Sequence, residues 1–589
     1  MVMRDLQNQK VRQGKGGLPD LLAVARGDHP ADMALRNGKV IDLVTGEMHR
    51  ADIALFGNKI AAVRSGLPAV QDIDLQGLFV CPGLVDAHVH IESAMLRPLE
   101  FAKLVAPHGV TTVISNPHEI ANVCGVSGIR FMCDDARFSP VDILMTIPSC
   151  VPATSHAGSG AALEPADLRR LLRYHGVVGL GEVMDFHGVI HGQPRLMHEL
   201  GLARGYPIDG HAPGVTGTQL DAYVAAGISS DHECSTANEA LAKLRRGMHL
   251  FLREGSAARN LQALLPVISS ETERWLAFCT DDRDAADLSR EGSIDHLVRM
   301  AVAAGVPLVT ALRMACFHPA QHYRLSDRGL IAPGRRADMI AFASLEDFRP
   351  RMVWQAGRLV ARDGKMVDGW AGSADTPFMP VLQDTVHIAW PSVDLRIPAQ
   401  GGRVRVIGVL EGQLVTEQRI LTGKLQHGEL LSDPDRDLLK LAVIERHHAT
   451  GRCGLGIVQG LQLRRGAVAS TVAHDHHNLI VAGADDRSML TAARAVADSG
   501  GGQAVALGDQ VLERLPLPLG GLMTQESAEE LIRIQSRLTA AVQRLGCGNA
   551  QLFMTLSFLG LEVIPELKLT DFGLIDVTAQ KVVPLFVDA

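Results

Sequence analysis

The sequence predicts an α/β protein with three parts: a (β/α)8 barrel, a small β-sandwich built from both flanks of the barrel, and a C-terminal α+β domain. Three observations predict this class. Between Leu78 and Arg283, apolar strand-like segments alternate with helical stretches, which is the rhythm of βα units. Eight such units within roughly 200 residues fit one barrel. Polar or glycine-rich tips follow the apolar segments, where barrel enzymes carry their active-site side chains.

Length and composition limit the classes of protein to consider. At 589 residues the chain is too long for one ordinary domain, and about two to four are expected. A hydrophobic content of 47% with 21% charged residues is typical of a globular protein with a large core. The formal charge of −8 and the aromatic content of 4% argue against nucleic acid as a partner.

The cysteines and the N-terminus predict a location. The nine cysteines include no C-x-x-C pair, which indicates reduced thiols rather than a disulfide framework. The polar N-terminus lacks the hydrophobic region of a signal peptide, and no apolar run approaches the roughly 20 residues that span a bilayer. We therefore expect a cytoplasmic protein with no membrane partner.

The flanks of the barrel have β character. Residues 1–30 are expected to form a polar N-terminal extension, with a short helix over Leu18 to Arg26. Residues 31–77 show short alternating strands with turns, and residues 330–375 return to this pattern. We expect these two segments to pair into one small β-sandwich, with the barrel between them at residues 78–329.

The barrel strands are expected at the apolar segments, and residues 294–318 are expected to form the helix after the last strand. The eight predicted strands are Phe79–His90, Val110–Glu119, Ile143–Ala153, Val177–Asp185, Pro207–Pro213, Gly227–Glu233, His249–Gly255 and Leu276–Arg283.

The last third of the chain follows a linker-like stretch at residues 369–378. Its composition stays globular, so residues 385–589 are expected to form a separate α+β domain. The expected strands are Arg403–Leu410, Val468–Val472 and Leu479–Ala482. The expected helices are Asp437–His447, Asp486–Ser499 and Ser527–Gln543.

An H-x-H pair ends the first predicted barrel strand. Residues i and i+2 of a strand point to the same face, so His88 and His90 can bind one metal ion together. Such a pair is weak evidence for a metal site on its own, because structural histidines also occur at this spacing.

Further histidines and carboxylates end the other predicted strands. Each one has an alternative structural role: Glu182 could be an ion-pair partner and Asp281 could cap a helix. Their joint occurrence at strand ends favours metal ligands, and imidazole with carboxylate suits zinc, manganese or iron. The strand-end residues are His88, His90, His118, Glu119, Glu182, His211, His232, Glu233, Asp281 and Asp282.

This order resembles the amidohydrolase superfamily, which has H-x-H on strand one, an acid on strand four, histidines on strands five and six, and aspartate on strand eight. The segment from Ile331 to Asp338 also resembles the I-A-P-G-x-x-A-D sequence that follows such barrels. Many binuclear members bridge their metals with a carboxylated lysine on strand four. This chain has Glu182 at that position, which narrows the set of superfamily members that it can resemble.

A closer resemblance is to the bacterial adenine deaminases of that superfamily, over about residues 30 to 589. The motifs that carry it are Ser115-Asn-Pro-His-Glu-Ile-Ala-Asn-Val-Cys-Gly125, Ser149-Cys-Val-Pro-Ala-Thr154, Gly179-Leu-Gly-Glu-Val-Met184, Asp209-Gly-His-Ala-Pro-Gly214, Arg253-Glu-Gly-Ser256, Thr280-Asp-Asp-Arg283, Thr471-Val-Ala-His-Asp-His-His-Asn478 and Pro516-Leu-Pro-Leu-Gly-Gly-Leu-Met523.

The resemblance implies hydrolytic deamination of adenine to hypoxanthine and ammonia in purine salvage, by a hydroxide held at two divalent metal ions. Mn²⁺ or Fe²⁺ is expected, with Zn²⁺ as the alternative. Barrels with a large additional domain often dimerise, so a homodimer is expected. The implied ligands are His88, His90 and Asp281 for one metal, His211 and His232 for the other, and Glu182 for both.

The same resemblance suggests roles at the rim. Asp281 would take the proton of the hydroxide and deliver it to the departing ammonia, with the adjacent Asp282 as the alternative. His118, Glu119 and Glu233 would protonate a ring nitrogen or hold the leaving amine, or else orient a metal ligand.

Other polar residues are open to two interpretations. Arg253 would form an internal ion pair with Glu254 or contact substrate. The residues from His474 to Asn478 would form a polar network that closes the active site or a domain interface, rather than a second metal site. The pair His447-His448 is expected on a helix at the solvated surface.

Three alternatives remain beside this interpretation, and a fourth class is excluded. A superfamily hydrolase acting on a cyclic amide is disfavoured by Glu182 in place of lysine and by Ser115-Asn-Pro-His-Glu119, whereas action on a different aminopurine stays open. A mononuclear adenosine-deaminase-like enzyme would carry a glutamate where this chain has Gly214, and the zinc deaminases with P-C-x-x-C are excluded. A non-catalytic purine-binding barrel should have lost metal ligands, and every candidate is present.

Overall fold

The computed structural model describes residues 17–368, 380–410, 413–549 and 551–587. The first half of the predicted N-terminal extension and the predicted linker at residues 369–378 lie outside these residues. The predicted short helix is confirmed as α1 (Leu18–Arg26), which ends at Gly27 in the left-handed conformation. Within the described parts of the chain, no helix combines the length and the apolar character needed to cross a membrane.

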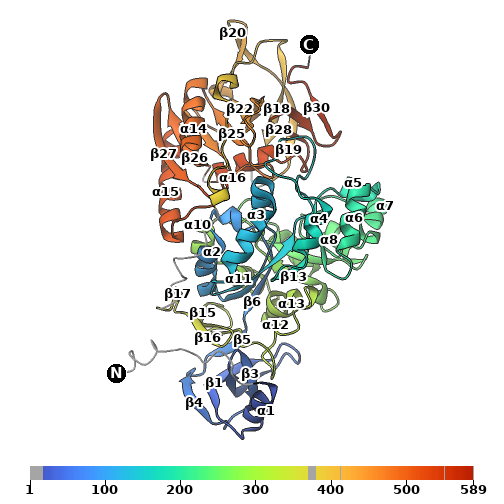
Figure 1. Cartoon of the computed structure of the whole chain (residues 1–589), viewed down its shortest axis with the longest axis vertical. Helices are drawn as coiled ribbons and strands as arrows, with labels where there is room; N and C mark the ends of the chain where they lie inside the picture. Colours follow the sequence, from blue (N-terminus) through green and yellow to red (C-terminus); the bar gives the residue numbers. More distant parts are fainter. Residues whose placement is uncertain (1–16, 369–379, 411–412, 550, 588–589) are drawn as a thin grey trace.

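Strands from both flanks of the barrel pair in one nine-stranded sheet at one end of the molecule (Figure 1). Antiparallel pairing of β5 with β14 joins the two segments, and Trp354 is buried in the core of this sheet. Its strands are β1 (Ala31–Ile41), β2 (Met48–Phe56), β3 (Lys59–Val63), β4 (Ala69–Asp74), β5 (Phe79–Pro82), β14 (Met339–Phe342), β15 (Pro350–Gln355), β16 (Arg358–Arg362) and β17 (Lys365–Met366).

Two parallel sheets occupy the middle of the molecule, in the orders β10-β9-β8-β7-β6 and β11-β12-β13. They are linked at one edge by the Ser229 amide, which donates to the Ile208 carbonyl at 2.9 Å, and at the other by Asp281 N–H to His88 O at 3.0 Å. The strands are β6 (Leu84–Val89), β7 (Val110–Ser115), β8 (Asp142–Ile147), β9 (Val177–Val183), β10 (Ile208–Gly210), β11 (Ser230–Asp231), β12 (His249–Arg253) and β13 (Leu276–Cys279).

The first predicted barrel strand, Phe79–His90, is wrong as a single element. The strand is interrupted at Gly83, so β5 belongs to the nine-stranded sheet and β6 begins the parallel sheet. A Cβ at Gly83 would overlap the side chain of Thr111, which is why the chain can cross β7 so closely at this point.

The parallel strands alternate with helices, as the sequence predicts. The predicted helix 294–318 is broken, however, because Gly305 adopts φ +95° and Pro307 follows it. The helices are α2 (Pro98–Val105), α3 (His118–Ala136), α4 (Pro165–Leu171), α5 (Phe186–Ile190), α6 (Pro194–Leu202), α7 (Gly217–Ala225), α8 (Ala237–Leu244), α9 (Leu261–Leu264), α10 (Ala285–Glu291), α11 (Ile294–Ala303), α12 (Leu308–Leu312) and α13 (His318–His322).

The C-terminal part contains an eight-stranded sheet in the order β19-β18-β23-β22-β25-β24-β26-β27. Its predicted strands and its last two predicted helices are confirmed within one or two residues. The main elements are β18 (Arg403–Val409), β19 (Thr416–Thr422), β22 (Leu438–Ile444), β23 (Cys453–Gln459), β24 (Ala467–Ser470), β25 (Leu479–Gly483), α14 (Asp486–Asp498), β26 (Gly502–Leu507), β27 (Gln510–Pro516), α15 (Ala528–Arg544) and α16 (Leu552–Ser557).

Smaller hairpins complete this part of the chain. They are β20 (Lys424–Gln426) with β21 (Glu429–Leu431), and β28 (Leu567–Thr570) with β29 (Gly573–Asp576) and β30 (Lys581–Val583).

The predicted helix over Asp437–His447 is wrong, because this segment forms the central strand β22. All seven residues of β22 are buried, and the strand pairs with both β23 and β25. Six of these seven residues are apolar, and so short an apolar segment has no periodicity that separates a buried strand from a buried helix.

The C-terminal part lies against the carboxyl ends of the parallel strands (Figure 1). The Thr524 amide donates to the Met95 carbonyl at 2.9 Å, just beyond β6. One hydrophobic cluster runs through both parts and includes residues such as Ile120 and Leu522. The strand ends that carry the predicted site are therefore covered by the last third of the chain.

Candidate active site

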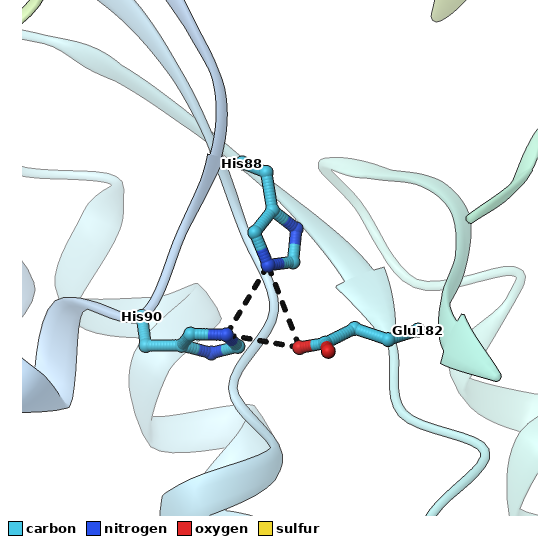
Figure 2. A group of neighbouring side chains, drawn as sticks. All are labelled: His88, His90 and Glu182. Atoms are coloured by element: carbon cyan, nitrogen blue, oxygen red, sulfur yellow. Dashed lines mark hydrogen bonds and ion pairs between the residues drawn. The ribbon is translucent and has the colours of Figure 1, made fainter. Parts of the chain in front are cut away.

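Three predicted ligands meet directly at the end of the parallel sheet (Figure 2). Nε2 of His88 and Nε2 of His90 lie 3.2 Å apart, since His88 near the end of β6 and His90 just after the strand point to the same side. Oε1 of Glu182, at the end of β9, lies 2.9 Å from Nε2 of His90 and 3.4 Å from Nε2 of His88. The three side chains are 1–3% exposed.

Asp281 completes this side of the site. Its Oδ1 lies 3.2 Å from Nε2 of His90 and 3.5 Å from Nε2 of His88. Its backbone has φ +54° and is held by two hydrogen bonds: its N–H donates to His88 O, and its carbonyl accepts from His90 N–H. The strained residue is thereby fixed against the end of β6.

The remaining predicted ligands face the other oxygen of Glu182. Nδ1 of His211 lies 3.0 Å from Oε2 of Glu182, and Nε2 of His232 lies 3.6 Å from it. The rings of His232 and His88 stack at 4.1 Å, so the two histidine groups are adjacent. One carboxylate therefore separates two pairs of imidazoles.

Charges in this cluster favour bound cations. Burial lowers the pKa of His88, but Asp281 and Glu182 outweigh it and raise the pKa to about 9. Burial opposes ionisation of Glu182, yet His90 and the other imidazoles hold the pKa of its carboxyl well below the usual range. The ionised carboxylates therefore favour the binding of cations at this buried site.

The donor set fits divalent metal ions. Among the described residues, buried groups that could hold an ion include His88, His90 with Glu182, and Glu182 with His211 and His232. Nε2 of His211 is buried with no hydrogen-bond partner in the described part of the chain. Imidazole nitrogens and carboxylate oxygens are the ligands that first-row transition metals prefer.

Asn116, which sequence reasoning missed, orients two of these ligands. Its Nδ2 donates to Oε1 of Glu182 at 2.9 Å, and its backbone carbonyl accepts from Nδ1 of His90 at 2.9 Å. Such hydrogen bonds fix the ring orientation and tautomer of a ligating histidine. The Ser115-Asn-Pro-His-Glu119 motif contained the residue, but nothing in the motif indicated this role.

The rim residues take varied positions. Nδ1 of His118 lies 3.3 Å from Oε1 of Glu182, and its Nε2 lies 3.1 Å from Oε1 of Glu119. Asp282 accepts a hydrogen bond from Ser93 and lines the cavity beside Asp281.

Arg253 does not pair with Glu254, so that predicted ion pair is wrong. Its guanidinium instead donates to Glu233 at 2.5 and 3.0 Å and to Oδ2 of Asp281 at 2.7 Å. Neighbouring residues on β12 point to opposite faces, and Arg253 points toward the strand ends that carry the two acids. It is 3% exposed and reaches the cavity through these acids.

The C-terminal part supplies one wall of the cavity. Sequence reasoning missed its apolar members, which no motif indicates. The cavity is lined by His90, His118, Glu119, Glu182, Met184, His211, His232, Glu233, Asp281, Asp282, Leu414, His474, Asp475, Phe558, Leu561 and Ile564.

The predicted polar network at His474 to Asn478 is present. Glu119 accepts hydrogen bonds from His474 and His477, and Nδ2 of Asn478 donates to Gly158 O at 2.8 Å. His447 does not lie on a surface helix as predicted: it is 7% exposed, and its Nε2 lies 2.7 Å from His476 O.

Parallel strands alternating with helices, with an H-x-H pair, strand-end histidines and an acid between them, define a metal-dependent hydrolase of the amidohydrolase type. The Amidohydrolase family model matches residues 79–360. The model described as Adenine deaminase C-terminal domain matches residues 413–581.

Whole-length relatives specify the family. Adenine deaminase of Desulfatibacillum aliphaticivorans is 44% identical over 96% of this chain and 99% of the relative. Adenine deaminase 2 of Carboxydothermus hydrogenoformans has the same identity and coverage. Adenine deaminase of Methanothrix thermoacetophila is 44% identical over 97% of this chain and 100% of the relative. The chain belongs to the adenine deaminase family.

Proposed function

We propose that this chain hydrolyses adenine to hypoxanthine and ammonia at a centre of two divalent metal ions. The observation that carries the proposal is the position of Glu182, whose two carboxylate oxygens face two separate pairs of histidines. A single ion would need one group only, whereas a carboxylate between two groups suits a bridging ligand. The relatives that match over nearly their full length are named adenine deaminase.

In this proposal the ligands divide as the geometry suggests. His88, His90 and Asp281 would hold one ion, His211 and His232 would hold the other, and Glu182 would be a ligand of both. Mn²⁺ and Fe²⁺ are proposed, with Zn²⁺ as the alternative. Ions in such a site act as Lewis acids and make a hydrolytic nucleophile available near neutral pH.

Asp281 is proposed to move the proton. Water adds at C6 of adenine, the C6–N6 bond breaks, and one proton of the water passes through a carboxylate oxygen of Asp281 to N6, which leaves as ammonia. The other proton ends on the ring as hypoxanthine forms. Burial alone would raise the pKa of Asp281, but Arg253 holds it well below its usual range, so the carboxylate starts ionised.

Glu233 is proposed to bind the purine. Its carboxylate lines the cavity 3.4 Å from Nε2 of His232 and is fixed from behind by Arg253. A carboxylate in this position accepts a hydrogen bond from an amine or ring N–H of the substrate. Arg253 is then a positioning residue for both acids. His118 and Glu119 are proposed to orient the ring side of the site.

Access to the site runs through a neighbouring cavity in this proposal. The space at the metal ligands is only about 20 Å³, whereas a cavity of about 520 Å³ lies beside it, lined by Cys150, Phe186 and Glu562 among others. Met184 lines both. Methionine is flexible enough to move aside, so it would separate water from the reaction once adenine is bound.

We also propose how the chain is divided into domains. The hydrogen bonds that link both edges of the two parallel sheets support a closed (β/α)8 barrel at residues 78–329. The pairing of β5 with β14 supports a flanking domain formed from residues 31–77 and 330–375. Residues 385–589 would then form the C-terminal α+β domain.

The proposal is tested with protein purified with iron chelated and manganese supplied. Ammonia release and the ultraviolet change from adenine to hypoxanthine are followed, with adenosine as the comparison substrate. Turnover of adenine and not of adenosine, lost in Glu182→Gln and Asp281→Asn, is the expected result. Absence of adenine turnover from protein with bound metal would overturn the substrate and lead to a panel of cyclic amides.

A further inference from the structure

A histidine of the C-terminal part faces the cavity with one nitrogen unused. His474, between β24 and β25, is 3% exposed and lines the cavity together with Glu182 and Asp281. Its Nδ1 donates to Oε1 of Glu119 at 2.5 Å. Its Nε2 is buried and has no hydrogen-bond partner anywhere in the described part of the chain.

The ring of His474 is held on two sides. It stacks on Phe558 at 4.5 Å with an angle of 13° between the planes. Glu119, at the start of α3, is itself fixed by Nε2 of His118 at 3.1 Å and by the ring of His477. The imidazole is therefore fixed in an orientation that leaves Nε2 unbonded, although a buried polar atom is normally paired.

His477, which contacts the same carboxylate as His474, has no unused nitrogen. Nε2 of His477 donates to Glu119, and its Nδ1 accepts from the Ala473 amide at 3.1 Å. Both nitrogens of that ring are used within the protein, as expected of a structural residue. Two histidines three residues apart thus contact the same carboxylate, and only one of them has a nitrogen available for a ligand.

We propose that Nε2 of His474 binds N3 or N7 of the purine ring, so that the C-terminal part of the chain supplies a substrate-contacting residue to the barrel site. This inference rests on the proposed adenine deamination. Glu119 is then a positioning residue, which holds the ring through Nδ1 and sets the direction of Nε2.

The charges around the ring assign Nε2 as the donor. Burial lowers the pKa of His474, but Glu119 and, more weakly, Asp282 raise it to about 9. The protonated ring donates from both nitrogens: Nδ1–H to Glu119 and Nε2–H into the cavity. Free adenine has lone pairs at N3 and N7, away from the reacting C6. Addition at C6 increases electron density on the ring nitrogens, so this hydrogen bond strengthens as the reaction proceeds.

A third metal ion does not explain the same geometry. Glu119, His474 and His477 also form a group that could hold an ion. The contacts within that group use Nδ1 of His474 and Nε2 of His477, the atoms that bond Glu119. An ion placed among them would still leave Nε2 of His474 without a partner.

The test compares His474→Asn with His427→Asn in the full-length, manganese-loaded enzyme. Asparagine keeps a donor near the position of Nδ1 and removes the nitrogen that faces the cavity. His427 lies on the exposed β20–β21 turn, at φ +52°, a conformation that asparagine tolerates. His474→Gln is the second variant, since its amide extends to the position of Nε2.

The substrates are adenine, 3-deazaadenine and 7-deazaadenine. We expect His474→Asn to lower kcat/KM for adenine about 10²-fold, in the range of positioned proton donors, with bound manganese unchanged. For the analogue that lacks the partner nitrogen, the same substitution should have almost no effect. His474→Gln should retain more activity than His474→Asn, and His427→Asn should match the parent enzyme.

The other outcomes overturn the inference. Equal losses on adenine and both analogues would show that His474 acts only through structure. A loss of one manganese per chain would assign the residue to a third metal site. Unchanged adenine turnover in both His474 variants would refute the contact while leaving the proposed function intact. If the parent enzyme fails on adenine, the proposed function itself is refuted.

Discussion

Replacement of Arg253 by methionine tests how the charged groups of the site are held. The side chain is 3% exposed and makes three hydrogen bonds to carboxylates, two to Glu233 and one to Asp281, besides two to Oδ1 of Asn260. Methionine fills a similar volume but leaves both carboxylates without the guanidinium. Removing one partner of a buried ion pair costs about 3–5 kcal/mol, because the remaining charge is desolvated and unpaired. We expect a loss of that size in the free energy of unfolding.

The same substitution should lower kcat for adenine about 10²-fold, because Asp281 loses the contact that fixes its carboxylate for proton transfer. Arg253→Lys should retain more stability but little more activity, since one ammonium cannot make the paired bonds of a guanidinium. Denaturant titration of the metal-loaded protein and steady-state ammonia release measure the two effects.

Arg290→Met is the matched control. Arg290 also pairs with aspartate and glutamate, but its side chain is 66% exposed, so its removal should cost only about 0–1 kcal/mol. Equal destabilisation by the two substitutions would refute the argument that burial of the ion network determines the cost. Normal kcat in Arg253→Met would refute the role of Arg253 in positioning Asp281.

Three further predictions concern the metal, the entrance and pH. Chelation should abolish ammonia release and added Mn²⁺ should restore it; activity that survives complete metal removal would contradict the metal site. Met184→Ala should change kcat/KM for adenine while the metal content stays nearly the same. An unchanged kcat/KM would argue against entry of substrate past this residue. Lys568 is buried, and among the described residues its ammonium donates only to the backbone carbonyls of Leu414 and Phe558, at 2.9 and 3.0 Å. Burial lowers the pKa of Lys568 to about 7. The unfolded chain therefore binds more protons above pH 7, so stability should rise by up to about 1.4 kcal/mol per pH unit between pH 7 and about 10. This slope should disappear in Lys568→Met, and equal slopes in both proteins would contradict the lowered pKa.

The strand-end positions were predictable because they follow from local geometry. The i, i+2 spacing placed His88 and His90 on one side of β6, and the parallel strand pattern brought Glu182 to the same edge. Nothing about these residues depends on contacts that only the folded chain reveals.

Other features depend on distant parts of the chain and could not be predicted. Two partners of Glu119, His474 and His477, lie 355 and 358 residues away, and the close approach at Gly83 depends on Thr111 of the next strand. The choice of Arg253 between Glu254 and Glu233 was decided by which face of β12 it occupies.

Burial in the C-terminal part was misjudged for a related reason. The apolar run from Leu438 to Ile444 fits a helix or a strand equally well until its two neighbouring strands are known. His447 follows that strand into the interior, so an error in the element became an error in the exposure of the histidine.

Metal content measured together with adenine turnover tests the central claim most directly. The metal-loaded parent enzyme should contain two ions per chain and release ammonia from adenine. Glu182→Gln should lose both metal and turnover, whereas His427→Asn should keep both. Full turnover of adenine with only one ion per chain would contradict a binuclear adenine-deaminating site bridged by Glu182. Absence of turnover with two ions bound would contradict it as well.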